Sequence, residues 1–284
     1  GYYTPLDREV VAIDGKTIRR SFNRGTEQGP LHIVSAFATE RGLSLGQLAV
    51  DGKSNEITAI PTLLDGLALK GNIVTIDAMG CQRTIAQQII NQQADYLLAL
   101  KGNQKKRHRS VVDYCQATCL TPGTSIKPDV DAFDELHGRL VRSRGWVCPV
   151  NEALAVLHDW PGIRNIVLIE RIRSVNGSDT TSTELRYYLS SCTDDPAVQI
   201  AADQRHWAIE NSLHWVLDVT FREDDSRIRD QVATRTFALL RKMALNIVRQ
   251  DSSSKASLRG RRKSAGWNND YMAHLLFGQR KVRP

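Results

Sequence analysis

The sequence has few cysteines, no long hydrophobic run and no recognisable leader segment. Its five cysteines form an odd, scattered set, which favours reduced thiols in a cytosolic protein over a disulfide framework. Cys115 and Cys119 are close together, but no second pair follows them at the spacing of a zinc site. No run approaches the roughly 18 apolar residues of a membrane span, and residues 1–10 lack the basic start and apolar core of a signal peptide. We therefore expect no membrane partner.

The composition excludes a disordered chain. With 284 residues, of which 41% are hydrophobic and 24% charged, the sequence can form one large domain or a domain with an insertion. It begins with Gly1 instead of methionine, which is consistent with a piece of a longer protein.

Three acidic residues stand in settings that suit a metal site. Asp14 in VVAIDGK and Asp77 in NIVTIDAMG end apolar runs typical of buried strands, and Glu210 in RHWAIEN lies in a segment with helical patterning. Two divalent cations about 3.5–4 Å apart need several carboxylates that converge on one point, and such pairs serve phosphoryl chemistry on nucleic acids. We therefore treat the three carboxylates as candidate metal ligands.

Positive charge is in excess and gathers near the C-terminus. The net charge of +7 and the pI of about 9.3 indicate a polyanionic partner. Residues 251–284 hold eight Lys or Arg and two Asp, whereas the other 250 residues hold 30 basic and 29 acidic side chains. A basic tail is equally compatible with a solubilising role, but cations beside a metal site suit a phosphate backbone. Two more basic clusters comprise Lys16, Arg19, Arg20 and Arg24 directly after Asp14, and KGNQKKRHR at 101–109.

Short apolar runs that alternate with polar turns predict a mixed sheet with helices on its faces. The expected elements are strands at 9–14, 31–40 and 41–50, a helix from Ser54 or Asn55 to Leu69 with a possible kink at Pro61, a strand at 72–77, a helix at 82–93 and a strand at 96–100. Active sites of such sheets lie beyond the carboxyl ends of the parallel strands. Asp14 and Asp77 both lie at strand ends, so we expect them at one edge.

The pattern changes after residue 104. Strands expected at 137–150, 165–175 and 184–191 predict a mostly antiparallel insertion, which separates Asp77 from Glu210 by 133 positions. A helix capped by Thr193 or Asp194 is expected to run to Leu217, and an amphipathic helix follows at 227–249. The predicted division is a core part at 1–104, a β-rich insertion at 105–192, a helical core part with Glu210 at 193–250 and a basic tail at 251–284.

Seven motifs, spread over nearly the whole length, carry a family resemblance. They are IDGKTIRRS, KSNEITAIPTLL, VTIDAMGCQ, ADYLLALKGNQ, HGRLVR, RHWAIENSLHWVLDV and KSAGWNNDYMAHLL. Through them the chain resembles the H-repeat-associated proteins, an insertion-sequence group of DDE transposases. The resemblance implies an α/β, RNase H-like fold with a β-rich insertion before the last catalytic helix. It also implies that Asp14, Asp77 and Glu210 form the catalytic, metal-binding triad.

The resemblance further implies metal-dependent DNA strand cleavage and transfer during transposition. Two Mg2+ or Mn2+ ions are the expected cofactors, and the expected partner is double-stranded DNA, both element ends and target. We expect a homo-oligomer on DNA in the bacterial cytoplasm, associated with the nucleoid. Family members usually carry a further N-terminal region before the first strand, and about a dozen residues precede Asp14 here. The expected phosphate contacts are Lys16, Arg19, Arg20, Lys101, Asn103, Gln104, Arg261, Arg262 and Lys263.

Other interpretations of the same residues stay open. The chain can be a degenerate, inactive DNA-binding relic of such an element, or a nuclease without strand transfer. His206, Glu210 and His214 follow one another at helical spacing, but such a row spans about 12 Å, too far for one metal to contact both histidines. Asp218 is the reserve metal ligand, and the remaining acids of DVTFREDD are expected in a turn or an arginine-pairing surface. Trp207 and Trp215 are expected in the core rather than stacked on a base.

Overall fold

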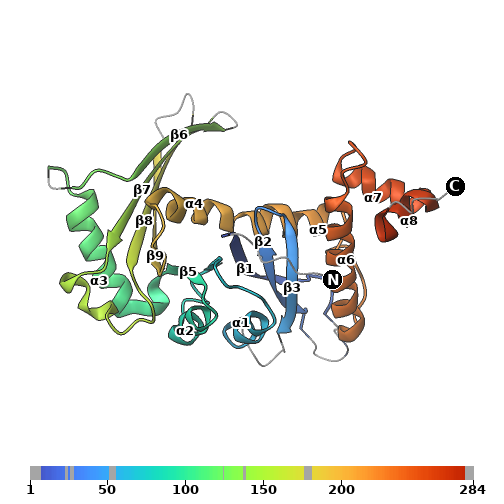
Figure 1. Ribbon diagram of the computed structural model, residues 1–284, viewed down its shortest axis with the longest axis horizontal. Coiled ribbons are helices and arrows are strands. Elements are labelled where there is room, and N and C mark those ends of the chain that lie inside the picture. The colour runs from blue at the N-terminus through green and yellow to red at the C-terminus, as the bar shows by residue number, and fades with distance from the viewer. Residues whose placement is uncertain are drawn as a thin grey trace.

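The computed structural model describes residues 8–22, 25, 29–50, 56–123, 125–136, 139–175 and 181–278. Its strands join into one nine-stranded mixed sheet with the order β3-β2-β1-β4-β5-β9-β8-β7-β6 (Figure 1). The strands are β1 Val10–Thr17, β2 His32–Ala38, β3 Leu43–Val50, β4 Ile73–Ile76, β5 Asp95–Leu100, β6 Val130–Leu136, β7 Arg139–Pro149, β8 Asn165–Val175 and β9 Thr181–Ser190.

The first five strands form one side of the sheet, with β3 at its edge, in the predicted manner. β1, β2 and β3 are antiparallel neighbours, and β1, β4 and β5 are parallel. The apolar run at the start of β1 is fully buried because helices cover both faces of the sheet at this point. Val11 and Ile13 pack with residues of α1 (Glu56–Asp65) and α2 (Arg83–Asn91). Ala12 points to the other face and packs with helical residues 209–217.

The strands after residue 130 extend this same sheet. β9 runs antiparallel to β5, with Leu97 paired to Ser190, and β8, β7 and β6 follow as antiparallel neighbours. The predicted strands at 137–150, 165–175 and 184–191 agree with β7, β8 and β9, whereas β6 was not predicted. Before them, α3 (Lys105–Cys115) and the π-helical η2 (Gln116–Leu120) form a helical segment that the sequence interpretation also missed. Its buried side is a short row of Val111, Cys115 and Cys119, and the sequence interpretation treated the polar residues before that row as a basic cluster.

The helices that carry the third acid are interrupted. α4 (Pro196–His206), the π-helical η4 (Ile209–His214) and α5 (Trp215–Val219) replace the single helix expected to run to Leu217. In Figure 1 they run along the sheet from the β-rich end toward α6 (Gln231–Gln250). The expected cap was wrong, because the side chain of Asp195 accepts the hydrogen bond from the backbone N–H of Ala197 at 2.8 Å.

The ends of two other predicted elements also differ. α1 ends at Asp65 instead of Leu69 and contains Pro61, while its expected caps, Ser54 and Asn55, lie outside the described residues. The basic C-terminal segment is helical rather than a simple tail. It forms α7 (Leu258–Trp267) and α8 (Asn269–Phe277), which contact α6 at the end of the molecule opposite the β-rich strands (Figure 1).

Among the helices of the described residues, none combines the length and the apolar character that crossing a membrane requires.

Candidate active site

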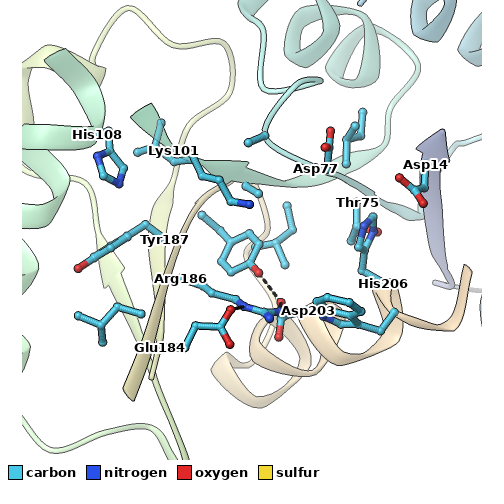
Figure 2. Close-up of a pocket in the computed structure, with 18 of the residues that line it drawn as sticks. Asp14, Thr75, Asp77, Lys101, His108, Glu184, Arg186, Tyr187, Asp203 and His206 are labelled. Atoms are coloured by element: carbon cyan, nitrogen blue, oxygen red, sulfur yellow. Dashed lines mark hydrogen bonds and ion pairs between the residues drawn. The ribbon is translucent and has the colours of Figure 1, made fainter. Parts of the chain in front are cut away.

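Asp77 directly follows the last residue of β4, whereas Asp14 lies within β1, which continues to Thr17 instead of ending at Asp14 as expected. The β1–β4 register pairs the residue before Asp14 with the residue before Asp77. The carboxylate of Asp77 is held in a turn, because its Oδ1 accepts hydrogen bonds from the backbone N–H groups of Met79 at 3.0 Å and Gly80 at 3.4 Å. Figure 2 shows both aspartates at the same end of one cavity, opposite the strand β9. The sheet thus brings together two acids that are 63 positions apart in the sequence.

Glu210 reaches this cavity from the helical layer. It lies in η4, a wide helical turn of the kind that is frequent at functional sites. Ile209 of this turn packs with Ala12, and Asp14 lies two positions beyond Ala12 on the same face of β1. The cavity has a volume of about 540 Å³, and Asp14, Asp77 and Glu210 all line it.

The electrostatics of Asp14 reflect this crowding. Burial raises the pKa of its carboxyl to about 7, and the negative charges of Glu210, Asp77 and Glu56 act in the same direction. A hydrogen bond from the backbone N–H of Gly15 opposes the shift. Each nearby negative charge thus makes ionisation of Asp14 less favourable, and a divalent ion bound among these carboxylates would offset that effect.

The carboxylates of the cavity are spread over its wall instead of meeting at one point. Among the described residues, they do not form a group whose ligand atoms all lie within 4.8 Å of one another. Metal–oxygen distances of about 2.1 Å keep two ligands of a single Mg2+ within roughly 4.2 Å of each other. Two ions about 4 Å apart bridge a wider set of oxygens. The described part of the chain thus shows no compact cage for a single ion at this cavity.

A tighter group of possible ligands lies elsewhere in the part of the chain that the structure describes. It consists of Asp95, Cys192 and Asp194. Arg8 already occupies the space between the two carboxylates, since its Nη1 donates to Asp95 at 2.8 Å and its Nε to Asp194 at 3.0 Å. This group is an ion-pair cluster that fastens the start of β1 to β5 and the segment before α4.

The chain matches known proteins over most of its length. Residues 5–247 match the family model described as Transposase DDE domain. The chain belongs to this transposase family. Its motifs therefore indicated the family correctly, and the match covers β1, β4 and the segment with Glu210, the three elements that supply the acids of the cavity.

Two bacterial relatives align with nearly the whole chain. The chain is 41% identical over 273 residues to "Putative transposase YncI" of Escherichia coli O157:H7, covering 95% of this chain and 69% of the relative. It is 38% identical over 278 residues to "H repeat-associated putative transposase YhhI" of Escherichia coli K12, covering 96% of this chain and 72% of the relative. Both names agree with the resemblance inferred from the motifs.

A solved structure has the same fold. The chain superposes with a TM-score of 0.53 and 9% identity on a chain of the piggyBac transposase synaptic complex with hairpin DNA. The match covers 98% of this chain and 56% of the piggyBac chain. At this identity the likeness concerns the fold alone, so the roles of individual side chains in this transposase-family protein rest on its own geometry.

The two histidines that flank Glu210 have different partners. Nδ1 of His206 lies 2.9 Å from Oγ1 of Thr75, while Nδ1 of His214 lies 3.4 Å from Oδ2 of Asp14. Burial lowers the pKa of His214 to about 3, and the charges of nearby lysines act in the same direction, so its imidazole is neutral. His206 thus contacts β4, whereas His214 contacts Asp14 of β1.

The basic cluster after Asp14 is matched by acids of the α5–α6 connection. The ammonium group of Lys16 contacts Asp218 and lies 2.8 Å from Oε2 of Glu223, and its side chain is only 14% exposed. Burial opposes its charge, but the charge of Glu223 and the hydrogen bond to Asp218 raise the pKa of Lys16. Arg19 and Arg20 form longer contacts with neighbouring acids and have side chains 83% and 54% exposed. The acids in the segment DVTFREDD thus pair with cations, as expected. Arg24 lies outside the described residues.

The loop after β5 faces the cavity and the turn of Asp77. Figure 2 shows the Lys101 side chain extending into the cavity. Asn103 Nδ2 donates to the carbonyl oxygen of Ala78 at 2.5 Å, and Gln104 Nε2 donates to that of Cys81 at 3.0 Å. The expected phosphate contacts thus separate into a lysine that extends into the cavity and two amides that hold the chain after Asp77. The sequence offers no signal for these amide contacts, because they join segments 23 to 25 positions apart.

The basic residues of α7 also make contacts within the chain. Arg261 donates to the backbone carbonyl oxygens of Val248 at 3.1 Å and Asp251 at 2.7 Å, at the end of α6. The guanidinium of Arg262 lies 5.8 Å from the ring centroid of Phe221, and the ammonium of Lys263 lies 5.8 Å from that of Trp267. Of the three predicted phosphate contacts in α7, Lys263 is the one classed as exposed.

The far end of the cavity is built by β9 and α4 and was not predicted. Buried Asp203 accepts hydrogen bonds from Tyr188 and from Arg171, the latter at 2.7 Å. The guanidinium of Arg186 lies 4.8 Å from the ring centroid of Trp207, which also lines the cavity. The expectation that Trp215 belongs to the core was wrong, since it is 59% exposed.

Proposed function

We propose that this chain is the catalytic part of a DDE transposase that cleaves and transfers DNA strands. The observation that carries the proposal is that Asp14, Asp77 and Glu210, from three separate elements, line one cavity. In this reading the three carboxylates hold two Mg2+ or Mn2+ ions. The ions would activate the attacking oxygen and stabilise the leaving oxygen of an in-line displacement.

The residues around Asp14, Asp77 and Glu210 would bind DNA or hold these carboxylates in position. Lys101 extends into the cavity and would contact a phosphate near the reacting bond, and Arg19, Arg20 and Lys263 would contact the backbone further away. His214 restrains Asp14, and Asn103 restrains the turn that holds Asp77. Lys16 is already paired with carboxylates, so a phosphate contact would require it to leave these partners.

We extend the proposal to the fold and the partners of this chain. We regard β1 to β5 with α1, α2 and α4 as an RNase H-like core, and residues 105–192 as an insertion whose strands extend its sheet. The printed title of the piggyBac structure names a synaptic complex with hairpin DNA. By analogy, we infer that this chain acts on double-stranded DNA as a homo-oligomer, in the bacterial cytoplasm.

The test is a cleavage assay on DNA duplexes that carry the ends of the element. We expect nicking by the unaltered chain with Mg2+ or Mn2+ and none with EDTA. Asp77→Asn should abolish nicking and retain DNA binding, whereas Asp113→Asn, at a carboxylate on α3 that is 73% exposed, should behave as the unaltered chain. Transfer of the cut 3′ ends to a second duplex distinguishes a transposase from a nuclease. DNA binding without cleavage under any metal condition would instead identify an inactive relic.

A further inference from the structure

His206 brings an imidazole into the cavity of the three carboxylates. It is the last residue of α4, and it lines the cavity together with Asp14, Asp77 and Glu210. Its contact on the sheet is Thr75, two positions before Asp77, so both side chains of this segment leave the sheet on the same face. Figure 2 shows His206 beside Thr75 in the cavity. The imidazole therefore lies on the side of the sheet where the acids gather.

The contact with Thr75 determines which ring nitrogen of His206 carries the proton. Nδ1 lies 2.9 Å from Oγ1 of Thr75, a residue that is 2% exposed. Among the described residues, the imidazole is the one hydrogen-bond partner of this hydroxyl group. A buried hydroxyl proton without an acceptor is costly, so the favoured arrangement has the hydroxyl donating to Nδ1. The proton of a neutral imidazole then lies on Nε2.

The imidazole is neutral, and its Nε2 is accessible. Burial lowers the pKa of His206, and the charge of Arg186 acts in the same direction, against the charges of Asp203 and Asp77. Nε2 of His206 has no hydrogen-bond partner in the part of the chain that the structure describes. Unlike Nε2 of His214, it is not a fully buried atom without a partner. The N–H group is therefore available to a ligand in the cavity.

The carboxylates near this N–H group have other donors. Oδ1 of Asp77 accepts from the backbone of its own turn, and Asp203 accepts from Tyr188 and from Arg171. Within the described ranges, no hydrogen bond joins either carboxylate to His206. A neutral donor that these acids leave unused suits an anionic ligand. Phosphoryl oxygens are such acceptors, and a donor already aimed at them stabilises the charge that they carry during displacement.

We propose that His206 is a further catalytic residue, whose Nε2–H group donates a hydrogen bond to a non-bridging oxygen of the reacting phosphodiester. The proposal rests on the function proposed above, because it adds a donor to the same site. No proton is transferred in this role, since the N–H bond stays intact and Thr75 holds the tautomer. Glu210 follows four positions later, so one short stretch of chain supplies a carboxylate and a neutral donor.

The donor is tested directly by nitrogen NMR of the full chain, labelled with 15N at histidine. The signals of His206 are assigned by their loss in His206→Gln. In the free chain we expect the tautomer with the proton on Nε2. A DNA duplex that carries an element end, added with Ca2+ in place of Mg2+, should shift the Nε2 signal of His206 and leave that of exposed His158 in place. A proton on Nδ1, or an unchanged Nε2 signal in the DNA complex, would overturn the proposal.

Three variants separate a contact with DNA from simple support of α4. Glutamine places an N–H donor near the position of Nε2, whereas asparagine reaches only the position of Nδ1 and keeps a partner for Thr75. We expect His206→Ala and His206→Asn to lower the single-turnover cleavage rate by about 100- to 1,000-fold, the usual effect of removing one such donor. His206→Gln should retain most of the rate. His158→Ala is the matched control.

Binding measurements on the same variants distinguish the remaining outcomes. The affinities for Mn2+, by calorimetry, and for DNA should stay close to those of the unaltered chain, because the contact strengthens in the transition state. Circular dichroism checks folding, and the glutamine and asparagine variants carry the comparison if His206→Ala does not fold. A rate for His206→Asn at or above that of His206→Gln refutes the proposal and leaves the proposed function standing. If the chain binds DNA without cleaving it, the NMR result decides; if it does neither, both proposals fail.

Discussion

Nδ1 of His214 lies 3.4 Å from Oδ2 of Asp14, and the two residues come from opposite layers of the fold. His214 is the last residue of η4, the turn that also carries Glu210, so one short segment both supplies a carboxylate and restrains another. The imidazole is buried and neutral, and its Nε2 has no hydrogen-bond partner in the described part of the chain. Nδ1 is thus the ring nitrogen that faces a carboxylate.

Replacing His214 should impair catalysis more than DNA binding. We expect His214→Ala to lower the single-turnover cleavage rate by about 10- to 100-fold, the usual effect of removing a group that orients a metal ligand. The affinity for DNA, measured by fluorescence anisotropy, should stay within about twofold. His214→Asn keeps an N–H donor and should recover part of the rate, while His158→Ala, at an exposed histidine, serves as the control. Equal rates for His214→Ala and the control would refute this role.

The raised pKa of Asp14 predicts a pH-dependent stability. Its carboxyl has a pKa of about 7 in the folded chain and an ordinary value of 3.8. The folded state therefore binds the proton more tightly, and its stability falls as the pH rises from about 4 to about 7, by up to about 1.4 kcal/mol for each pH unit. Above pH 7 this contribution is lost.

Melting curves in EDTA at pH 5 and pH 8 test this prediction. The melting temperature of Asp14→Asn should fall less between the two pH values than that of the unaltered chain, because asparagine has no proton to lose. Added Mn2+ should raise the melting temperature of the unaltered chain more at pH 8 than at pH 5, since ligands must be deprotonated to bind. The same pH profile for both proteins would show that Asp14 titrates normally.

Asn103 and Lys101 should have separable effects although they are neighbours. Asn103→Ala removes the hydrogen bond to Ala78, so we expect a lower cleavage rate, a loss of about 1 kcal/mol of stability and an unchanged salt dependence of DNA binding. Lys101→Ala should weaken DNA binding. The slope of log affinity against log salt concentration should become shallower by about one. Binding titrations at several salt concentrations and a cleavage assay distinguish the two. A smaller salt slope for Asn103→Ala would assign it to phosphate contact instead.

Lys16 and Arg19 should also differ. Lys16→Met leaves Glu223, which is 2% exposed, without its cation, and breaking a buried pair of this kind costs about 3–5 kcal/mol. We expect a clear loss of stability in urea. Arg19→Ala, at a side chain that is 83% exposed, should leave stability within about 0.5 kcal/mol and weaken DNA binding. If Lys16→Met retained full stability, the ion pairs of Lys16 would not be structural.

Local sequence patterns were enough to place the elements that carry the acids. The apolar runs before Asp14 and Asp77 form buried strands, because side chains buried on both faces leave an uninterrupted hydrophobic run. The motifs also led to the correct family. The same approach missed α3, whose short apolar row follows a run of charged residues, and the break between α4 and η4, since a wide turn keeps helical patterning.

The sequence by itself determined which residue types are available: three acids at two strand ends and a helical segment, basic clusters beside them, and a glycine after Asp14. Only the tertiary structure decided which partners these side chains contact. Lys16 meets Glu223 over 207 positions, Asn103 reaches the turn of Asp77, and Glu56 approaches Gly15 from another layer. Such contacts depend on strand register and helix packing, which arise from the whole core, so no local pattern records whether a charge faces DNA or another part of the chain.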